Sequence, residues 1–352
     1  MFFPLIFYSR RSYHVVMENI RVSGAQAASP NGKEKKMNAL NHPAPPRRQS
    51  QSRQFFRAVR KHRLHLAMIL PVMCWYLLFR YGPLYGITLA FKDFQLLRGI
   101  TGSPWVGLAN YKRLFGSYDF KNVFTNTIVI AGLNFLFGFP APILLALMLN
   151  ELRAQKFKRV AQSLSYLPHF ISWVILTGIF MELLSPSRGP VNTLLKALGL
   201  QPVYFLGDAK YFRGTLVVTN IWKTIGWNSI VYLAALGGVN EELYDAARVD
   251  GCGRWARIWH VTLPGITPVV TIMLIMAVGS LVEDNFDQVF NLLNPAVYST
   301  GDVLGTYIYR QGITNMDYSY STAVELFRNL ISLVLVLSAN FISKRVNEYG
   351  LW

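Results

Sequence analysis

Polar side chains interrupt one apolar stretch of the sequence and could together bind a ligand. Lys223 lies about ten residues into the segment Gly214 to Leu236. Three further residues share or border its helical face: Asn220, Trp227 and Asn228. Amide groups and an indole ring suit a ligand's hydroxyls and apolar ring face, and a cation suits carboxylates. The alternative is that Lys223 pairs with an acid elsewhere in the fold while the tryptophan packs in the core.

Two smaller groups of charged residues accompany other apolar segments. Glu283, Asp284 and Asp287 follow the segment Ile266 to Val282. We favour ordinary solvation for them, and the alternative is that Asp287 belongs to a ligand path. Glu325 and Arg328 are three residues apart in a later segment and most simply pair with each other.

A polar stretch between two apolar segments, residues 240–264, predicts a short helix, a glycine break and a second short helix. Asn240 is a good N-cap, and the next two residues are acids that favour a first helical turn. Leu243, Ala246 and Ala247 form a narrow stripe of mostly small side chains. Gly251 can take the left-handed conformation that ends a helix. Such a unit, parallel to a membrane, offers a surface to another protein, and an interfacial amphipathic helix is equally allowed.

The elements that must position these residues are membrane-spanning helices. The chain has 352 residues, of which 52% are hydrophobic and 15% charged, whereas soluble domains carry about a quarter charged residues. A helix needs about 20 mostly apolar residues to cross a bilayer. Six segments qualify: His65 to Leu84, Val123 to Met148, Val160 to Leu184, Gly214 to Leu236, Ile266 to Val282 and Ala323 to Ile342. We therefore expect an all-α membrane protein with six transmembrane helices.

Basic residues concentrate at the start of the chain. Residues 1–64 hold 13 of the 35 Lys and Arg residues against two acids and are rich in Pro, Ser, Gln and Asn. This composition predicts a disordered cytosolic leader whose end anchors the first span by the positive-inside rule. A nucleic-acid arm is the alternative, but no basic module with interleaved aromatic residues follows it. Met37 is a second candidate start, so nothing is inferred from residues 1–36.

The count of six spans places both termini on the same side of the membrane. A short loop with four basic residues, Asn150 to Arg159, follows the second span and favours the cytosol for that side. The polar stretch 240–264 is then cytosolic as well. We expect a multi-pass protein of the bacterial inner membrane with both termini in the cytosol.

The stretch 240–264 resembles the EAA loop of binding-protein-dependent ABC importer permeases. That family has Glu-Ala-Ala, a Gly four residues after the second Ala, and Ile-x-Leu-Pro. This chain has Asp245-Ala246-Ala247, Gly251 and Val261-Thr262-Leu263-Pro264, with Asp for Glu and Val for Ile. Three further stretches look like the complex-oligosaccharide branch of carbohydrate-uptake permeases: Phe79 to Asp93, Gly102 to Tyr111 and Ile342 to Trp352. The resemblance covers roughly Leu66 to Trp352.

The resemblance implies a permease subunit that moves sugars, and we expect oligosaccharides from polysaccharide breakdown, by alternating access. It implies four partners: a second permease in a heterodimeric pore, a cytosolic ABC ATPase dimer, an extracytoplasmic solute-binding protein and membrane lipid, with no nucleic acid. Coupling to the ATPase is expected of Asp245, Ala246, Ala247, Arg248, Asp250, Gly251, Leu263 and Pro264. The candidate sugar path consists of Asn220, Lys223, Trp227, Asn228 and Asp287.

The expected domain order follows from these segments. It runs through the leader (1–64), the first span with a long extracellular loop (65–122), the permease core (123–345) and a cytosolic tail (346–352). We expect no catalytic residue, metal or cofactor on this chain, because its only Gly-Lys pair lacks the P-loop pattern. ATP and Mg²⁺ are expected at the partner ATPase.

Three alternatives remain open. One is an ABC permease for a solute other than a sugar. Another is a secondary transporter, which needs internal repeats and coupling-ion acids at mid-membrane. The last is a membrane-embedded enzyme, which needs an intramembrane catalytic set.

Overall fold

The structure, a computed structural model, describes residues 63–347. The expected leader, apart from its last two residues, and residues 348–352 of the expected tail lie outside this range. Within it the regular elements are all helices, and the only β-type pairing is one isolated bridge between Lys92 and Trp105. The expectation of an all-α protein is confirmed for these residues.

The chain divides into two compact units, Met1–Trp75 and Tyr76–Trp352. The described residues of the first unit, 63–75, belong to α3 (Arg63–Tyr76), none of which is buried. The second unit contains the α-helices α4 (Gly99–Gly102), α5 (Ala109–Gly116), α6 (Tyr118–Leu133), α7 (Pro140–Glu151), α8 (Gln155–Tyr166), α9 (Trp173–Leu183), α10 (Pro190–Ala197), α11 (Ala209–Leu236), α12 (Glu241–Val249), α13 (Arg254–Arg257), α14 (Leu263–Gly279), α15 (Phe286–Leu292), α16 (Tyr298–Gly301), α17 (Leu304–Tyr309) and α18 (Tyr318–Asn347).

Tighter and wider helical turns join several of these helices. Four are π-helical: η1 (Leu77–Tyr81), η3 (Asn134–Gly138), η5 (Ile258–Thr262) and η7 (Arg310–Thr314). Three are 3₁₀-helical: η2 (Gly82–Phe91), η4 (Leu167–Phe170) and η6 (Pro295–Val297). The turn η3 joins α6 to α7 within one continuous helical run, and π-turns inside α-helices are frequent at functional sites.

Four of the six expected spans are continuous helical runs long and apolar enough to cross a membrane. They are Arg63–Phe91, Tyr118–Glu151, Arg254–Gly279 and Tyr318–Arg345. Their outward faces expose large apolar side chains such as Leu144 on α7 and Leu333 on α18, as expected for contact with lipid. The expected fourth span falls on α11, which is 28 residues long but is not among the helices that are apolar enough.

The expectation of one straight helix from Val160 to Leu184 is wrong. The structure has α8 and η4, then a bend of 106°, then α9. Two residues explain the break. Pro168 lies in η4 and cannot donate a backbone hydrogen bond to the preceding turn. Ser172 starts a new helix as its N-cap, because its hydroxyl accepts the backbone N–H of Ile175.

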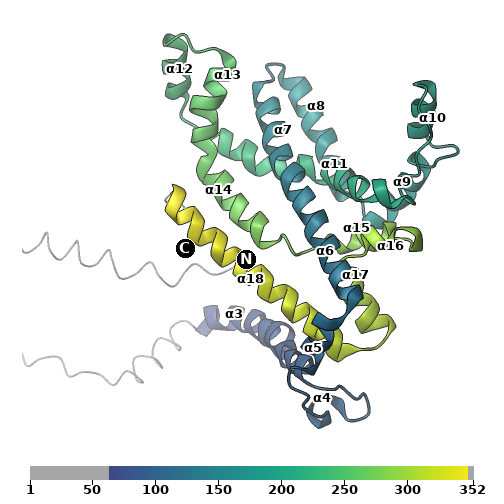
Figure 1. Ribbon diagram of the computed structural model, residues 1–352. Coiled ribbons are helices and arrows are strands. Elements are labelled where there is room, and N and C mark those ends of the chain that lie inside the picture. The colour runs from purple at the N-terminus through teal and green to yellow at the C-terminus, as the bar shows by residue number, and fades with distance from the viewer. Residues whose placement is uncertain (1–62, 348–352) are drawn as a thin grey trace, which may run out of the picture. The chain divides into compact units, whose positions relative to one another are not determined.

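The helix α11 is the centre of the second unit. It packs along α7 and also contacts α8 and α14. Tyr232 and Leu236 of α11 form a buried apolar cluster with Ala146 and Ile266. At Gly226 the approach of α8 is so close that a Cβ atom built there would meet the backbone oxygen of Ser165 at 2.0 Å. In Figure 1, α12 and α13 extend beyond one end of α14.

Candidate functional site

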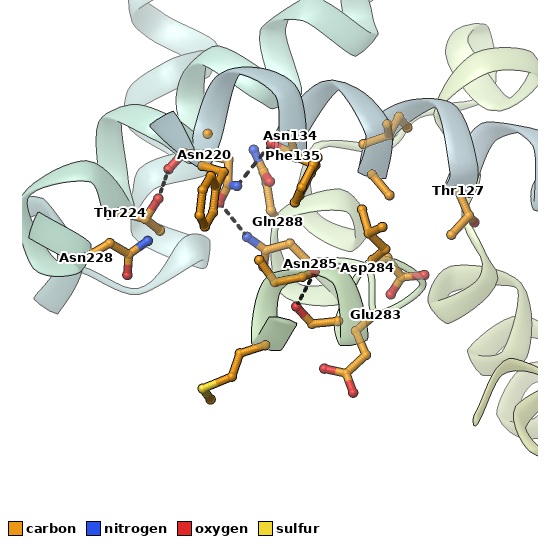
Figure 2. Close-up of a pocket in the computed structure, with 18 of the residues that line it drawn as sticks. Thr127, Asn134, Phe135, Asn220, Thr224, Asn228, Glu283, Asp284, Asn285 and Gln288 are labelled. Carbon is orange, nitrogen blue, oxygen red and sulfur yellow. Dashed lines mark hydrogen bonds between the residues drawn. The ribbon is translucent and has the colours of Figure 1, made fainter. Parts of the chain in front are cut away.

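The second unit contains an open cavity of about 450 Å³ between four helical segments. Its walls come from the α6–η3–α7 run, α11, α14 and the segment that leads into α15 (Figure 2). Apolar side chains, including Phe135, Phe139 and Met276, line part of it. The polar lining consists of Thr127, Asn134, Asn220, Thr224, Asn228, Tyr232, Ser280, Glu283, Asp284, Asn285 and Gln288.

A chain of side-chain amides crosses the cavity wall. Asn220 Nδ2 donates to Asn134 Oδ1 at 3.2 Å, and Asn285 Nδ2 donates to Asn220 Oδ1 at 3.0 Å (Figure 2). These bonds join η3, α11 and the start of α15. Asn285 occupies the N-cap position of α15, yet its side chain makes no capping bond to that helix. Its amide serves the contact to α11 instead.

Gln288 fixes α15 against α11 beside these amides. Its side chain is 1% exposed, and Nε2 donates to the Leu216 carbonyl at 2.7 Å and to Thr219 Oγ1 at 2.8 Å. A buried amide with two satisfied donors holds one orientation, because losing either bond leaves a buried polar group unpaired. The wall of the cavity is therefore rigid on this side.

The two acids of the cavity are in different environments. Glu283 is exposed and has no ion-pair partner among the described residues. The Asp284 side chain is 4% exposed, accepts the backbone N–H of Gly305 at 2.5 Å, and lies 3.8 Å from Arg328 Nη1. Its burial raises its pKa, and the Gly305 and Arg328 interactions oppose that rise. Our expectation of ordinary solvation is wrong for Asp284.

Arg328 pairs with Glu325 at 2.8 Å, as its spacing predicted. Arg328 does not line the cavity of Figure 2. It lines a second pocket, together with Tyr309, Tyr318 and Glu325. The described residues that line the cavity therefore include two carboxyl groups and no Lys or Arg.

Lys223 does not reach the cavity. Its side chain is 8% exposed, and its ammonium donates to three carbonyl oxygens at the break between η4 and α9, those of Pro168, His169 and Ile171. The ammonium also lies 5.3 Å from the centre of the Trp173 ring. The alternative of pairing with an acid is wrong, because within residues 63–347 the ammonium hydrogen-bonds only to carbonyl oxygens and forms no ion pair.

Trp227 faces the same helix break. Its ring stacks on His169 with the centres 4.4 Å apart and is 42% exposed. At about 100° per residue, positions 220, 223, 224, 227 and 228 fall on one arc of about 140°, with Lys223 and Trp227 toward one edge and Thr224 and Asn228 toward the other. The structure turns Lys223 and Trp227 to η4, whereas Asn220, Thr224 and Asn228 line the cavity.

Of the five residues of the predicted sugar path, two line the cavity. Asn220 and Asn228 are there, whereas Lys223, Trp227 and Asp287 are not, and Asp287 is exposed on α15. Sequence reasoning missed Asn134, Thr224 and Asn285. The sequence did contain an indication for Asn134, because burying an amide within an apolar span is energetically unfavourable and such residues often have a functional role.

The predicted coupling unit is a short capped helix, α12. Asn240 Oδ1 accepts the Glu242 backbone N–H at 3.0 Å, which confirms the expected N-cap. Gly251 has φ +75°, which confirms the left-handed residue after the helix. The N–H of Cys252 bonds to the Ala247 carbonyl and the N–H of Gly251 to that of Arg248, the two bonds of a Schellman motif.

The outer face of α12 is available to another molecule. Val249 is 88% exposed, Ala246 and Leu243 are exposed, and of the expected stripe only Ala247 is buried. Asp245 and Arg248 form an exposed ion pair with each other at 2.8 Å. A helix that is fixed at both ends and presents apolar and charged side chains is suited to docking.

Contacts link α12 to the cavity wall. Tyr244 on α12 donates to Thr262 Oγ1 at 3.1 Å, and Thr262 is the last residue of η5. The next residues, Leu263 and Pro264, begin α14, with Pro264 in the first turn as predicted. The far end of α14 contributes Met273 and Met276 to the cavity.

Comparisons with known proteins agree with the fold and show the family of the chain. Residues 138–348 match the family model described as binding-protein-dependent transport system inner membrane component. Protein LplB of Bacillus subtilis (strain 168) is 40% identical over 84% of this chain and 93% of its own length. The polygalacturonan/rhamnogalacturonan transport system permease protein YteP of the same organism is 40% identical over 87% and 95%.

Solved structures are similar over the same extent. A bacterial ABC transporter involved in the import of the acidic polysaccharide alginate contains a chain that is 41% identical, with a TM-score of 0.78. The match covers 84% of this chain and 99% of that one. A bacterial alginate ABC transporter in complex with an alginate pentasaccharide-bound periplasmic protein matches with 40% identity and the same TM-score and coverage.

Proposed function

The chain belongs to the family of inner membrane components of binding-protein-dependent transport systems, and we propose that it is the pore-forming permease subunit of an ABC importer for oligosaccharides. The observation that carries the substrate class is the cavity of Figure 2, where amides and aromatic rings meet between the spans. Amides both donate to and accept from hydroxyls, and rings pack on the apolar face of a sugar. Two similar proteins support oligosaccharides, because YteP is named for polygalacturonan/rhamnogalacturonan transport and the alginate importer for the import of a polysaccharide.

In this proposal, α12 and the start of α14 couple the permease to a cytosolic ABC ATPase dimer, which binds ATP and Mg²⁺. The coupling residues are Asp245, Ala246, Ala247, Arg248, Asp250, Gly251, Leu263 and Pro264. Support comes from the exposed outer face of α12 and from its fixed ends. Both termini of the chain lie in the cytosol in this proposal. A second permease completes the pore, and a solute-binding protein delivers the oligosaccharide at the outer face.

Movement passes from the ATPase to the cavity along one path. Closure of the ATPase dimer displaces α12, the Tyr244–Thr262 bond carries the displacement to η5, and α14 continues from η5 to the cavity wall. A rigid helix moved at one end rearranges its contacts at the other, which is how packed helices switch between two arrangements. Access to the cavity then alternates between the two sides of the membrane.

The test is reconstitution of the full complex in lipid vesicles with its binding protein. We expect ATP hydrolysis that rises when both oligosaccharide and binding protein are present, together with uptake of the labelled oligosaccharide. Stimulation by a solute other than a sugar contradicts the substrate class. Uptake without ATP, driven by an ion gradient, contradicts the importer class and favours a secondary transporter.

A further inference from the structure

The charge of the cavity bears on which oligosaccharides this permease accepts. Sugars from polysaccharides are neutral, with hydroxyls only, or acidic, with a carboxylate on uronate rings. A site for uronates needs cations, typically Arg or Lys, opposite the carboxylates. The two classes therefore require cavity walls of different composition.

Two cations close to the cavity have other partners. Lys223 is turned to η4, and three carbonyl oxygens occupy its three N–H donors. Arg328 lies behind Asp284 and pairs with Glu325. Neither residue lines the cavity.

The acid that does line the cavity without a partner is Glu283. Its carboxylate is exposed and no cation lies within ion-pair distance among the described residues. A uronate carboxylate brought close to it is repelled, and the repulsion grows as the cavity excludes water. A neutral hydroxyl meets no such penalty and can donate to the carboxylate.

The amides of the wall match hydroxyls in the same way. Three side-chain amides are joined by two hydrogen bonds, from Asn220 Nδ2 to Asn134 Oδ1 and from Asn285 Nδ2 to Asn220 Oδ1. The Asn134 amino group and the Asn285 side-chain oxygen take part in neither bond. The side chain of Asn228 has no hydrogen-bond partner among the described residues. A free acceptor such as the Asn285 oxygen needs a donor, which a hydroxyl supplies and a carboxylate lacks.

We infer that the cavity wall formed by this chain selects neutral oligosaccharides and disfavours those with uronate carboxylates. The inference rests on the proposed function and sharpens its substrate class. It separates this chain from the similar importer of the acidic polysaccharide alginate. Glu283 is the residue that sets the preference, while the amides bind either class through its hydroxyls.

The test measures sugar binding to the purified permease–ATPase complex without binding protein, so that the binding protein's own selectivity does not enter. The probes are tetragalacturonate and its fully methyl-esterified form, which share one backbone and differ in charge. Saturation-transfer NMR detects weak binding of each. We expect the neutral ester to bind wild type about fivefold or more tightly than the acid.

Three variants make the test specific. Glu283→Gln removes the charge and is expected to bring the binding of the acid close to that of the ester. Asn228→Lys adds a cation and is expected to reverse the preference. Asp287→Asn removes a nearby exposed carboxylate outside the cavity and is expected to leave the ratio of the two affinities unchanged.

Equal or tighter binding of tetragalacturonate by wild type overturns the inference, as does an unchanged ratio in Glu283→Gln. Binding of neither probe also overturns it. The proposed function fails separately, when no sugar stimulates ATP hydrolysis by the complex reconstituted with its binding protein.

Discussion

At the scale of single residues, Lys223 illustrates how a charge is kept inside a helical bundle. A broken helix leaves carbonyl oxygens without N–H partners, and these oxygens carry partial negative charge. The Lys223 ammonium donates to three carbonyls at the η4–α9 break, and one of them, that of Pro168, also accepts the backbone N–H of Ile171. The charge and the break satisfy each other, so neither needs a charged partner.

Removing this cation is expected to destabilise the fold. Lys223→Met retains the length of the side chain but removes the donor from three carbonyls, of which only that of Pro168 keeps the Ile171 N–H, at a cost of about 2–4 kcal/mol. Thermal unfolding of the purified protein measures the loss. The control is Lys210→Met, which removes an exposed lysine from the same helix. Equal unfolding midpoints for the two variants would show that Lys223 is not needed at the break.

Asn220 is the central member of the amide chain, so its loss should affect transport more than folding. Asn220→Leu breaks the bonds to Asn134 and Asn285 and removes two polar groups from the cavity. We expect oligosaccharide uptake to fall about tenfold, since one or two hydrogen bonds to the sugar are lost. Uptake by Asn291→Leu, which changes an amide outside the cavity, serves as control. Full uptake by Asn220→Leu removes the cavity from the sugar path.

Sequence alone places the α11 residues of the predicted sugar path on one broad arc and does not say which part of it faces the cavity. The 100° step puts Asn220 about 20° from Trp227 and about 80° from Asn228, so it does not separate the residues that line the cavity from those that contact η4. The partners that decide the matter, Asn134 and Pro168, are more than 50 residues away along the chain. Our prediction chose residues by type, and of the five residues of the predicted sugar path only the two amides, Asn220 and Asn228, line the cavity.

At the scale of elements, α12 was predictable because its ends obey local rules. The N-cap of Asn240 and the left-handed Gly251 depend on residues within one helical turn. The break in the third expected span also has local signals, Pro168 and Ser172, but a continuous apolar pattern conceals them. Hydropathy indicates that a segment is buried or in contact with lipid, but it does not indicate whether the helix axis bends within that segment.

The coupling role of α12 predicts variants that assemble but do not transport. Proline cannot adopt φ +75°, so Gly251→Pro distorts the end of α12. Ala247→Arg forces a long charged side chain into a buried position. We expect both to abolish uptake while the protein remains in the membrane, with ATP hydrolysis no longer stimulated by sugar.

The matched control for the turn is Gly253→Ala. Its backbone is extended at φ −69°, and a Cβ atom there has no neighbour within 4 Å. It is expected to transport as wild type does. Wild-type uptake by Gly251→Pro or Ala247→Arg contradicts the coupling assignment.

The contact between α11 and α8 predicts a second pair of variants. A methyl group at Gly226 meets the Ser165 backbone and forces the helices apart, so Gly226→Ala is expected to cost about 1–3 kcal/mol. Gly214→Ala, earlier in the same helix, meets no atom within 4 Å and is expected to be neutral or slightly stabilising. Thermal unfolding compares the two. Equal stability of both variants would mean that the close approach is not required.

At the scale of the whole molecule, the number of spans was harder to predict than the fold class. Composition alone indicated a helical membrane protein, and four of the six expected spans are continuous apolar helices. The other two are the bent pair and α11. A helix that lines a polar cavity carries amides and a lysine, so by composition it does not resemble a lipid-exposed helix.

The residues of α11 that contact the broken helix differ from those that line the cavity, which has a consequence for how such importers diversify. Lys223 and Trp227 contact η4, and Asn220, Thr224 and Asn228 line the cavity proposed for the sugar, so mutations in the two groups are expected to act on different properties. Substrate range can then drift at positions 220, 224 and 228 without a matching loss of stability. A combinatorial library confined to those three positions is accordingly the economical starting point for redirecting the importer to a new cargo.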